Sequence, residues 1–260
     1  MFRFGGSTRR SSLYGLAVAL GVLGVGGLLI AQSGQLPTAK TSVTPDLSGV
    51  WYLARPDPNG FSTWTITKES LPMLPWAAEK YKAARSGPLR QEWDKGIDAL
   101  DPSQSCFPLG PTRAFQIGRP FEIHHLPEYV LILFEWDHAV RRIYTDGRGH
   151  PEGYPVSFMG HSIGKWDGDT LVADTVYVAE ETWLDGLGHP HTADVHIVER
   201  FRRVKPNMLK IDFWFDDPKA YTRPWTGTKS FDLQAPDFEL MEHSICEDWL
   251  KMGTKRNAVE

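Results

Sequence analysis

The feature that most constrains the fold of this chain is a close succession of short, strand-like segments after residue 120. These segments are rich in β-branched and aromatic residues, and turn-forming residues such as Asp167-Gly168-Asp169 and Lys205-Pro206-Asn207 separate them. The spacing is typical of an antiparallel meander that closes into a barrel or folds into a sandwich, and we favour the barrel. The predicted strands are 46–53, 121–126, 129–136, 140–144, 162–166, 170–177, 195–204, 209–215, 229–233 and 239–245.

One helix is predicted, over residues 76–85, because Pro75 suits the first helical position and Ala, Glu and Lys fill the segment. Residues 86–119 contain too much Gly, Pro, Ser and Asp for regular structure, so they form a long insertion laid over the sheet. The sequence therefore predicts an all-β, mainly antiparallel fold. It is a closed or partly open barrel with one short helix and a long insertion loop, in a single domain over 46–250 before a polar tail over 251–260.

The first 33 residues read as an export signal. Three arginines precede an apolar run over 13–30, and no acidic residue comes before Asp46. The pair Arg9-Arg10 and the mildly apolar segment after it resemble a twin-arginine signal. We expect a periplasmic or secreted protein, with residues 34–45 as a polar linker; the alternative is an uncleaved membrane anchor.

The net charge and the cysteine content limit the classes of partner and cofactor that this chain is expected to bind. Removing residues 1–33 deletes three arginines and no acid, so the net charge of −4 becomes −7, which argues against nucleic acid and anionic lipid as partners. The sequence has neither a phosphate loop nor a dinucleotide fingerprint, and no cofactor is predicted. The two cysteines, Cys106 and Cys246, are either a disulfide candidate or two unpaired core thiols.

Three carboxylates share a strand phase with apolar residues: Glu135, Asp174 and Glu199. Side chains in the apolar phase of a half-buried strand point inward, where the loss of water raises a carboxyl pKa and suits general acid or base chemistry. The alternative is that an arginine neutralises each of them. The candidates are Arg141, Arg142, Arg200, Arg202 and Arg203.

Histidines supply the second group of candidate catalytic residues. Neighbours on a strand point to opposite faces, and His125 shares the phase of Phe121 and Ile123, so it is the inward candidate of its pair. A loop at the barrel mouth would bring Asp185 together with His189 and His191 as a proton-transfer group, with His161, His125 and Glu199 deeper in the cavity. The alternative is a glycine-shaped turn whose histidines only satisfy their neighbours.

The spacing of His189, His191 and His196 resembles the first half of a cupin metal motif, and three imidazoles suit zinc or iron. Pro190 removes a backbone donor and places the first pair in a loop rather than on a strand. A metal site at these three residues is therefore kept as an alternative, and no metal is predicted.

Tryptophan is abundant, with ten residues, and several lie at predicted strand ends or in loops. Such residues line a cavity for a flat or apolar ligand, or else belong to the core. The predicted ligand-binding residues are Trp136, Trp183, Trp214, Arg141 and Tyr144.

The entry into the first strand, Gly49-Val50-Trp51, resembles the Gly-x-Trp signature of lipocalin-type barrels. More of the chain resembles a large group of exported bacterial proteins, mostly without an assigned activity. That resemblance implies export and a single domain, and carries no catalytic roles. It rests on Asp46-Leu47-Ser48-Gly49-Val50-Trp51, Gly160-His161-Ser162-Ile163-Gly164-Lys165-Trp166, Gly168-Asp169-Thr170-Leu171, Thr182-Trp183-Leu184-Asp185, Gly188-His189-Pro190-His191, Glu199-Arg200-Phe201-Arg202-Arg203 and Asp217-Pro218-Lys219-Ala220-Tyr221-Thr222.

Together these features predict an exported, cofactor-independent enzyme that carries out acid–base chemistry on a small, partly apolar organic molecule in a barrel cavity. A lyase, isomerase or cyclase would fit. The first alternative is a non-catalytic, lipocalin-like ligand-binding protein, and the second is a histidine-ligated metalloenzyme. The oligomeric state is left open.

Overall fold

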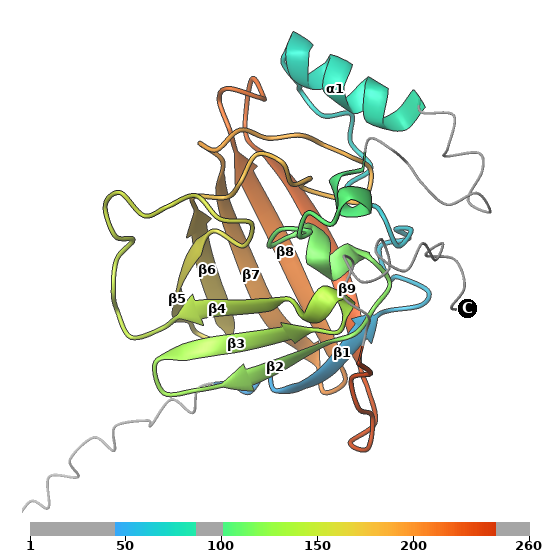
Figure 1. The fold of residues 1–260 in the computed structure, drawn as a ribbon. Coiled ribbons are helices and arrows are strands. Elements are labelled where there is room, and N and C mark those ends of the chain that lie inside the picture. Colours follow the sequence, from blue (N-terminus) through green and yellow to red (C-terminus); the bar gives the residue numbers. More distant parts are fainter. Residues whose placement is uncertain (1–44, 87–100, 243–260) are drawn as a thin grey trace, which may run out of the picture. The chain divides into compact units, whose positions relative to one another are not determined.

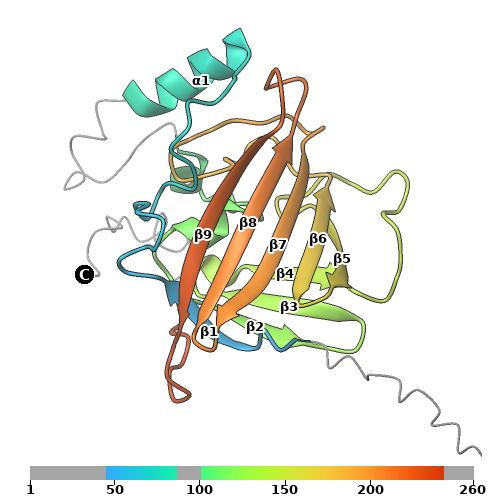
Figure 2. The ribbon, with the colours of Figure 1, turned by 180° about the vertical axis from the view of Figure 1, so that it is seen from behind.

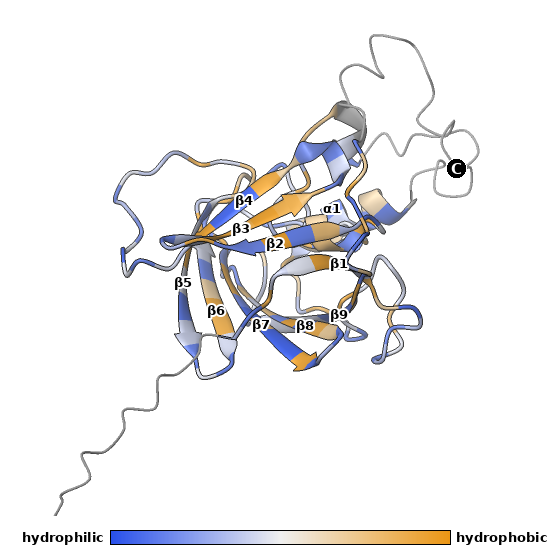
Figure 3. Ribbon diagram, turned by 90° about the horizontal axis from the view of Figure 1, so that it is seen from below, coloured by the Kyte–Doolittle hydropathy of each residue, from blue (hydrophilic) through white to orange (hydrophobic). Residues whose placement is uncertain are grey.

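The computed structural model describes residues 45–86 and 101–242. Within them the strands form a closed barrel in the order of the chain, which confirms the predicted all-β barrel. Figure 1 shows the barrel from one side and Figure 3 shows the ring of strands from below. The strands are β1 (Gly49–Leu53), β2 (Phe121–His125), β3 (Tyr129–Phe134), β4 (Val140–Tyr144), β5 (His161–Asp167), β6 (Thr170–Val176), β7 (His196–Lys205), β8 (Met208–Asp216) and β9 (Trp225–Leu233).

Neighbouring strands pair antiparallel with one exception, the parallel pair β4 and β5. The longest ladders join β7, β8 and β9, which lie side by side in Figure 2. The sequence of β8 alternates as a half-buried strand requires: Leu209, Ile211, Phe213 and Phe215 are buried, and the residues between them are only partly buried. This alternation places one face of the strand in the barrel interior.

A phenyl ring from the insertion occupies the barrel interior. Phe115 lies on the short helix η4 (Arg113–Gln116) and is buried. Burial of such a ring contributes about 1.5–3 kcal/mol, so residues 101–120 act as part of the core rather than as a loose surface loop. The ring of Phe115 contacts the rings of Phe121, Phe134, Phe201, Phe213 and Phe231, which come from five strands.

The predicted helix is confirmed as α1 (Pro75–Ser86). It lies beyond the end of the barrel at which β8 ends and β9 begins (Figures 1 and 2). The loops 177–195 and 217–224 connect strands at this same end. No helix in 45–86 or 101–242 is long and apolar enough to cross a membrane.

Two expectations about strands were wrong. Residues 239–242 are not in a strand, although the sequence predicts one over 239–245, and the remainder of that segment lies outside the described residues. Asp174 points away from the interior, because its neighbours Ala173 and Thr175 are the fully buried residues of β6. The predicted export signal over 1–33, most of the linker over 34–45, residues 87–100 of the insertion and the tail over 251–260 also lie outside the described residues.

Candidate functional site

The six predicted catalytic residues lie in four separate places. Glu199 is inside the barrel, His161 is on its outer face, and His125 is at the end of β2. The loop between β6 and β7 holds the other three, Asp185, His189 and His191. The six residues therefore do not converge on one cavity, as the sequence predicts, but lie in four environments with different chemistry.

Glu199 faces inward as expected, and it is fully paired. Arg141 of β4 donates from Nη1 to Glu199 Oε1 at 2.9 Å and from Nη2 to Oε2, and both side chains are at most 1% exposed. Arg141 also donates to the hydroxyls of Ser162 and Thr175 and to the carbonyl oxygen of Pro111. A bidentate pair with additional hydrogen bonds is a structural crosslink between strands, so neither residue is placed to meet a ligand.

Asp185 and His189 form the contact that their spacing suggests. Asp185 Oδ2 lies 2.6 Å from His189 Nδ1, and both side chains are buried. Tyr81 of α1 stacks on the His189 ring with 4.2 Å between the ring centroids. The pair is thus covered by the helix.

His191 does not join this pair. Its Nδ1 donates to the carbonyl oxygen of Thr192 at 2.8 Å, so its Nε2 accepts from the hydroxyl of Thr182 at 2.7 Å. Burial lowers the His191 pKa, against the opposing effect of the hydrogen bond to Thr192. A buried histidine with both nitrogens satisfied matches the alternative interpretation of a structural residue.

His125 lies near the opposite end of β5 from His161. Its Nε2 accepts a hydrogen bond from the backbone N–H of Leu47 at 3.1 Å, and its ring stacks on Trp166. Trp166 lies near the end of β5, whereas His161 begins that strand. His125 is half-buried, and burial lowers its pKa.

Four polar side chains meet on the outer face of β5, β6 and β7 and form what we call the outer-face cluster: His150, His161, Asp174 and His196. Asp174 Oδ1 accepts from His196 Nε2 at 2.8 Å and from His150 Nε2 at 3.3 Å. His150 Nδ1 lies 2.8 Å from His161 Nδ1. The result is one continuous hydrogen-bonded chain, His196–Asp174–His150–His161.

Strand register explains why these residues meet. Asp174 is paired with Val198 of β7, and His161 is paired with Val176 of β6. Ser162, Thr175 and Ile197 are buried, so their neighbours His161, Asp174 and His196 point outward. His150 comes from the loop 145–160, which connects the parallel strands β4 and β5 and returns across this face.

Within the outer-face cluster, two histidines have pKa values shifted in opposite directions. The hydrogen bond to Asp174 raises the His196 pKa. Burial lowers the His161 pKa, and the charges of His150 and Arg148 lower it further. Burial also opposes ionisation of Asp174, but the hydrogen bonds and charges of His196 and His150 outweigh it and lower the carboxyl pKa.

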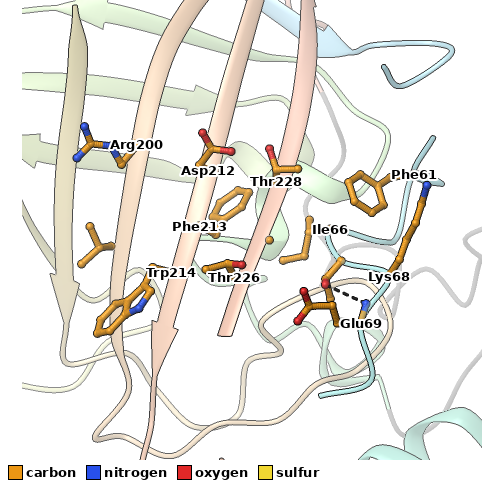
Figure 4. A pocket seen from close by; sticks show the side chains of 13 residues that line it. Phe61, Ile66, Lys68, Glu69, Arg200, Asp212, Phe213, Trp214, Thr226 and Thr228 are labelled. Carbon is orange, nitrogen blue, oxygen red and sulfur yellow. Dashed lines mark hydrogen bonds between the residues drawn. The ribbon is translucent and has the colours of Figure 1, made fainter. Parts of the chain in front are cut away.

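A groove of about 550 Å³ lies beside the outer-face cluster, on the outer face of β7, β8 and β9 (Figure 4). The segment 61–69 forms its other wall, and we call it the outer groove. The side chains that define its character are Phe61, Ile66, Val198, Trp214, Thr226 and Thr228. The charged residues Lys68, Glu69, Arg200 and Asp212 also line the groove. Apolar walls with a few polar groups are typical of a site for a small organic molecule.

Register also connects the outer groove with the outer-face cluster. Val198 is paired with Trp214, and Trp214 with Thr226, so one row of outward side chains runs from Asp174 along the groove wall. His196 precedes Val198 by two residues on the same face, a separation of roughly 6.6 Å along a strand. The Trp214 ring meets the His196 ring edge-on with 5.5 Å between centroids.

The predicted ligand-binding residues also lie in separate places. Trp214 lines the outer groove, and Tyr144 stacks on His161 with 5.5 Å between ring centroids. Trp183 is buried beneath the guanidinium of Arg113, and Trp136 packs against the hydrophobic core. Arg141 is the partner of Glu199 already described.

The three histidines of the alternative metal site lie apart, because His189 bonds Asp185, His191 bonds Thr182, and His196 bonds Asp174. In the part of the chain that the structure describes, no group of three or more His, Cys, Asp or Glu side chains is arranged to hold a metal ion. Cys106 is in a disulfide bond. Cys246, the only other cysteine of the sequence, lies outside the described residues.

Comparison with known proteins adds no family. Neither a scan against protein-family models nor a search of curated proteins found a match to this chain. The candidate site therefore rests on its own geometry.

Proposed function

We propose that this chain is an exported enzyme that moves protons on a small, partly apolar organic molecule held in the outer groove. The observation that carries the proposal is the position of His196, between the groove wall at Val198 and Trp214 and the carboxylate of Asp174. A lyase or isomerase reaction fits this arrangement. The chemistry proposed needs no cofactor, and export is inferred from the composition of residues 1–33.

His196 is the candidate catalytic group. Its Nε2–H is donated to Asp174, which leaves Nδ1 to exchange a proton with a ligand. Its side chain is 39% exposed and contacts Trp214 of the groove wall, so a ligand that extends past Trp214 would meet it. Asp174 is a positioning residue, because it fixes the tautomer of His196 and raises its pKa.

The other two histidines of the outer-face cluster, His150 and His161, provide a second place for a transferred proton. Opposite pKa shifts within one hydrogen-bonded chain separate an acid from a base. The raised pKa of His196 makes it the more basic of the two imidazoles, and the lowered pKa of His161 makes that one the less basic. His150 bonds both Asp174 and His161 and so links the two ends of the chain.

The test uses an enolisable aromatic ketone, 2-tetralone, in D2O, with deuterium uptake followed by mass spectrometry. We expect the full-length protein to accelerate uptake and His196→Gln to lower the accelerated rate by about 100-fold or more, the usual size of a general acid–base contribution. His124→Gln is the matched control, because the His124 side chain is 43% exposed and pairs with Glu122 at the other end of the barrel. An unchanged rate in His196→Gln would contradict the proposal.

The alternative is a non-catalytic ligand-binding protein, and the outer groove itself favours it, since binding there requires no proton transfer. Adding the same ketone to the protein distinguishes the binding protein from the enzyme. Binding of the ketone with quenching of Trp214 fluorescence, but without deuterium uptake above the uncatalysed rate, would support the binding protein over the enzyme.

A further inference from the structure

The loop 145–160, which connects β4 and β5 (Figure 1), covers His161 of the outer-face cluster. His161 is only 5% exposed, although it points away from the barrel interior. Two side chains of the loop lie against it, the His150 ring at 5.0 Å and the Tyr154 ring at 4.9 Å between ring centroids. Movement of the loop away from β5 would therefore expose the His161 imidazole.

Few contacts hold this loop in place. Residues 146–156 are exposed apart from His150, and within the described ranges they make no backbone–backbone hydrogen bond. Other contacts of the loop include a hydrogen bond from the Tyr177 hydroxyl to the carbonyl oxygen of Pro151 at 3.2 Å, and the packing of Tyr154 on the Tyr177 ring. Because so little apolar area is buried, the two hydrogen bonds of His150 supply a large share of the attachment of the loop.

The contact between His150 and His161 depends on protonation. Their Nδ1 atoms lie 2.8 Å apart, so one nitrogen donates its proton and the other accepts with a lone pair. A histidine with both nitrogens protonated has no lone pair left and can only donate. When both rings are in that form, the hydrogen bond is lost and two positive charges face each other.

Asp174 supplies one negative charge to the three histidines of the outer-face cluster. Its Oδ1 is shared between Nε2 of His150 and Nε2 of His196. Full protonation of the cluster therefore sets three imidazolium charges against one carboxylate. The excess of positive charge favours separation of the His150 and His161 rings.

The other charged groups near the pair do not remove this excess. Arg148 adds a positive charge, which Asp146 matches. Burial lowers the His161 pKa, and the charges of His150 and Arg148 lower it further. The rings that surround the pair belong to tyrosines, which stay neutral in acid. They are Tyr144, Tyr154 and Tyr177.

We propose that the loop 145–160 is an acid-opened cover of the outer-face cluster, closed while the His150–His161 hydrogen bond exists and opened when both imidazoles are protonated. Closure is fully favoured above about pH 6.5, the ordinary histidine value, and is lost as the pH falls through the lowered pKa of His161. As regulation of the cluster this rests on the proposed function, whereas movement of the loop itself requires no turnover.

The experiment compares ¹⁵N-labelled full-length protein at about pH 7.5 and about pH 5 by NMR. The first measurement is the scalar coupling between the Nδ1 nuclei of His150 and His161, which is transmitted only across a hydrogen bond. The second is the order parameter of the backbone amides of Gly149, Gly153 and Tyr154. We expect the coupling and order parameters near about 0.85 at the higher pH, and no coupling and order parameters below about 0.6 at the lower pH. The amides of β8 should stay rigid at both, which shows that the barrel remains folded.

Two asparagine variants remove one titrating ring each and keep an acceptor. In His161→Asn the amide oxygen accepts from His150 Nδ1–H and acquires no charge, so the order of the loop should be the same at both pH values. In His150→Asn the amide oxygen accepts from His161 Nδ1–H, with the same expected result. His138→Asn is the matched control, because His138 is an exposed histidine between β3 and β4, and this variant should respond to pH as the parent does.

A coupling that persists at about pH 5, or an unchanged order of the loop in the parent, would overturn the proposal. So would pH-dependent order of the loop in either asparagine variant at the pair, because another group would then be the cause. A failure of His196→Gln to slow deuterium uptake would leave these NMR results unaffected and would refute the proposed function alone.

Discussion

Gly160 lies so close to β6 that a Cβ at this position would be 2.6 Å from the carbonyl oxygen of Val176. Its backbone is in the left-handed region, with φ of +63°. Because Gly160 immediately precedes His161, this close approach sets the position of one end of the outer-face cluster. The glycine is therefore required for both its conformation and its small size.

Gly160→Ala is expected to destabilise the fold more than Gly168→Ala does. Gly168 has a similar φ of +59°, and a Cβ added there would meet no atom within 4 Å, so its replacement costs only backbone strain of about 1–2 kcal/mol. The clash at Gly160 should add about 1–3 kcal/mol. Urea unfolding of the two variants measures the difference, and equal losses would contradict the role of the close contact.

Glu199→Gln is expected to lower the free energy of unfolding by about 3–5 kcal/mol, because it leaves the Arg141 charge buried without its partner. The exposed pair Arg200–Asp167 supplies the control, and Arg200→Ala should cost less than about 1 kcal/mol. Replacing both buried partners, as Arg141→Met with Glu199→Leu, should cost less than Glu199→Gln alone. Similar losses in all three proteins would argue against a tightly coupled buried pair.

Asp174→Asn should lower the pKa of His196, which NMR titration of the imidazole protons measures directly. In the folded parent the His196 pKa is raised, so its contribution to stability is fully present below the unfolded value of about 6.5 and is lost as the pH rises through the folded pKa. The variant should lose that part of the pH dependence. A His196 pKa that does not move would mean that Asp174 does not tune it.

Lys229 makes stability depend on pH in the alkaline range. Its Nζ is enclosed by the carbonyl oxygens of Ser62 and Thr65, and burial lowers its pKa to about 8. Between pH 8 and about 10.4 the unfolded chain binds more protons at this residue, so stability should rise with pH across this window. Lys229→Met should lack the rise, and parallel slopes in the two proteins would contradict the lowered pKa.

The fold could be predicted because the strands carry strong alternation and clear turns. In β7 and β8 most charged residues fall in one phase and most apolar residues in the other, so the inward face of Ile197, Glu199 and Phe201 follows from the sequence. In β6 both phases are apolar, with Leu171 in one and Val172 in the other, and the pattern alone places Asp174 on the wrong face. Pairing with β5 and β7 decides that orientation, and pairing cannot be seen in a single strand.

The outer-face cluster could not be predicted as a unit. His161, Asp174 and His196 come from three strands whose register fixes their distances, and His150 comes from a loop without a periodic pattern. The spacing of Asp185 and His189 does carry a signal in the sequence, because a short loop keeps such residues close whatever the strands do. Local proximity was therefore predictable, whereas convergence across strands was not.

The parallel contact between β4 and β5 has a consequence for folding kinetics. It consists of two residue pairs, Ile143 with Ser162 and Tyr144 with Ile163, and it joins the ladders of β2, β3 and β4 to those of β5 to β9. Arg141 and Glu199 come from the two sides of this junction and are 58 residues apart in the sequence. Contacts between residues far apart in the sequence form late, so Glu199→Gln should accelerate unfolding and leave the folding rate nearly unchanged.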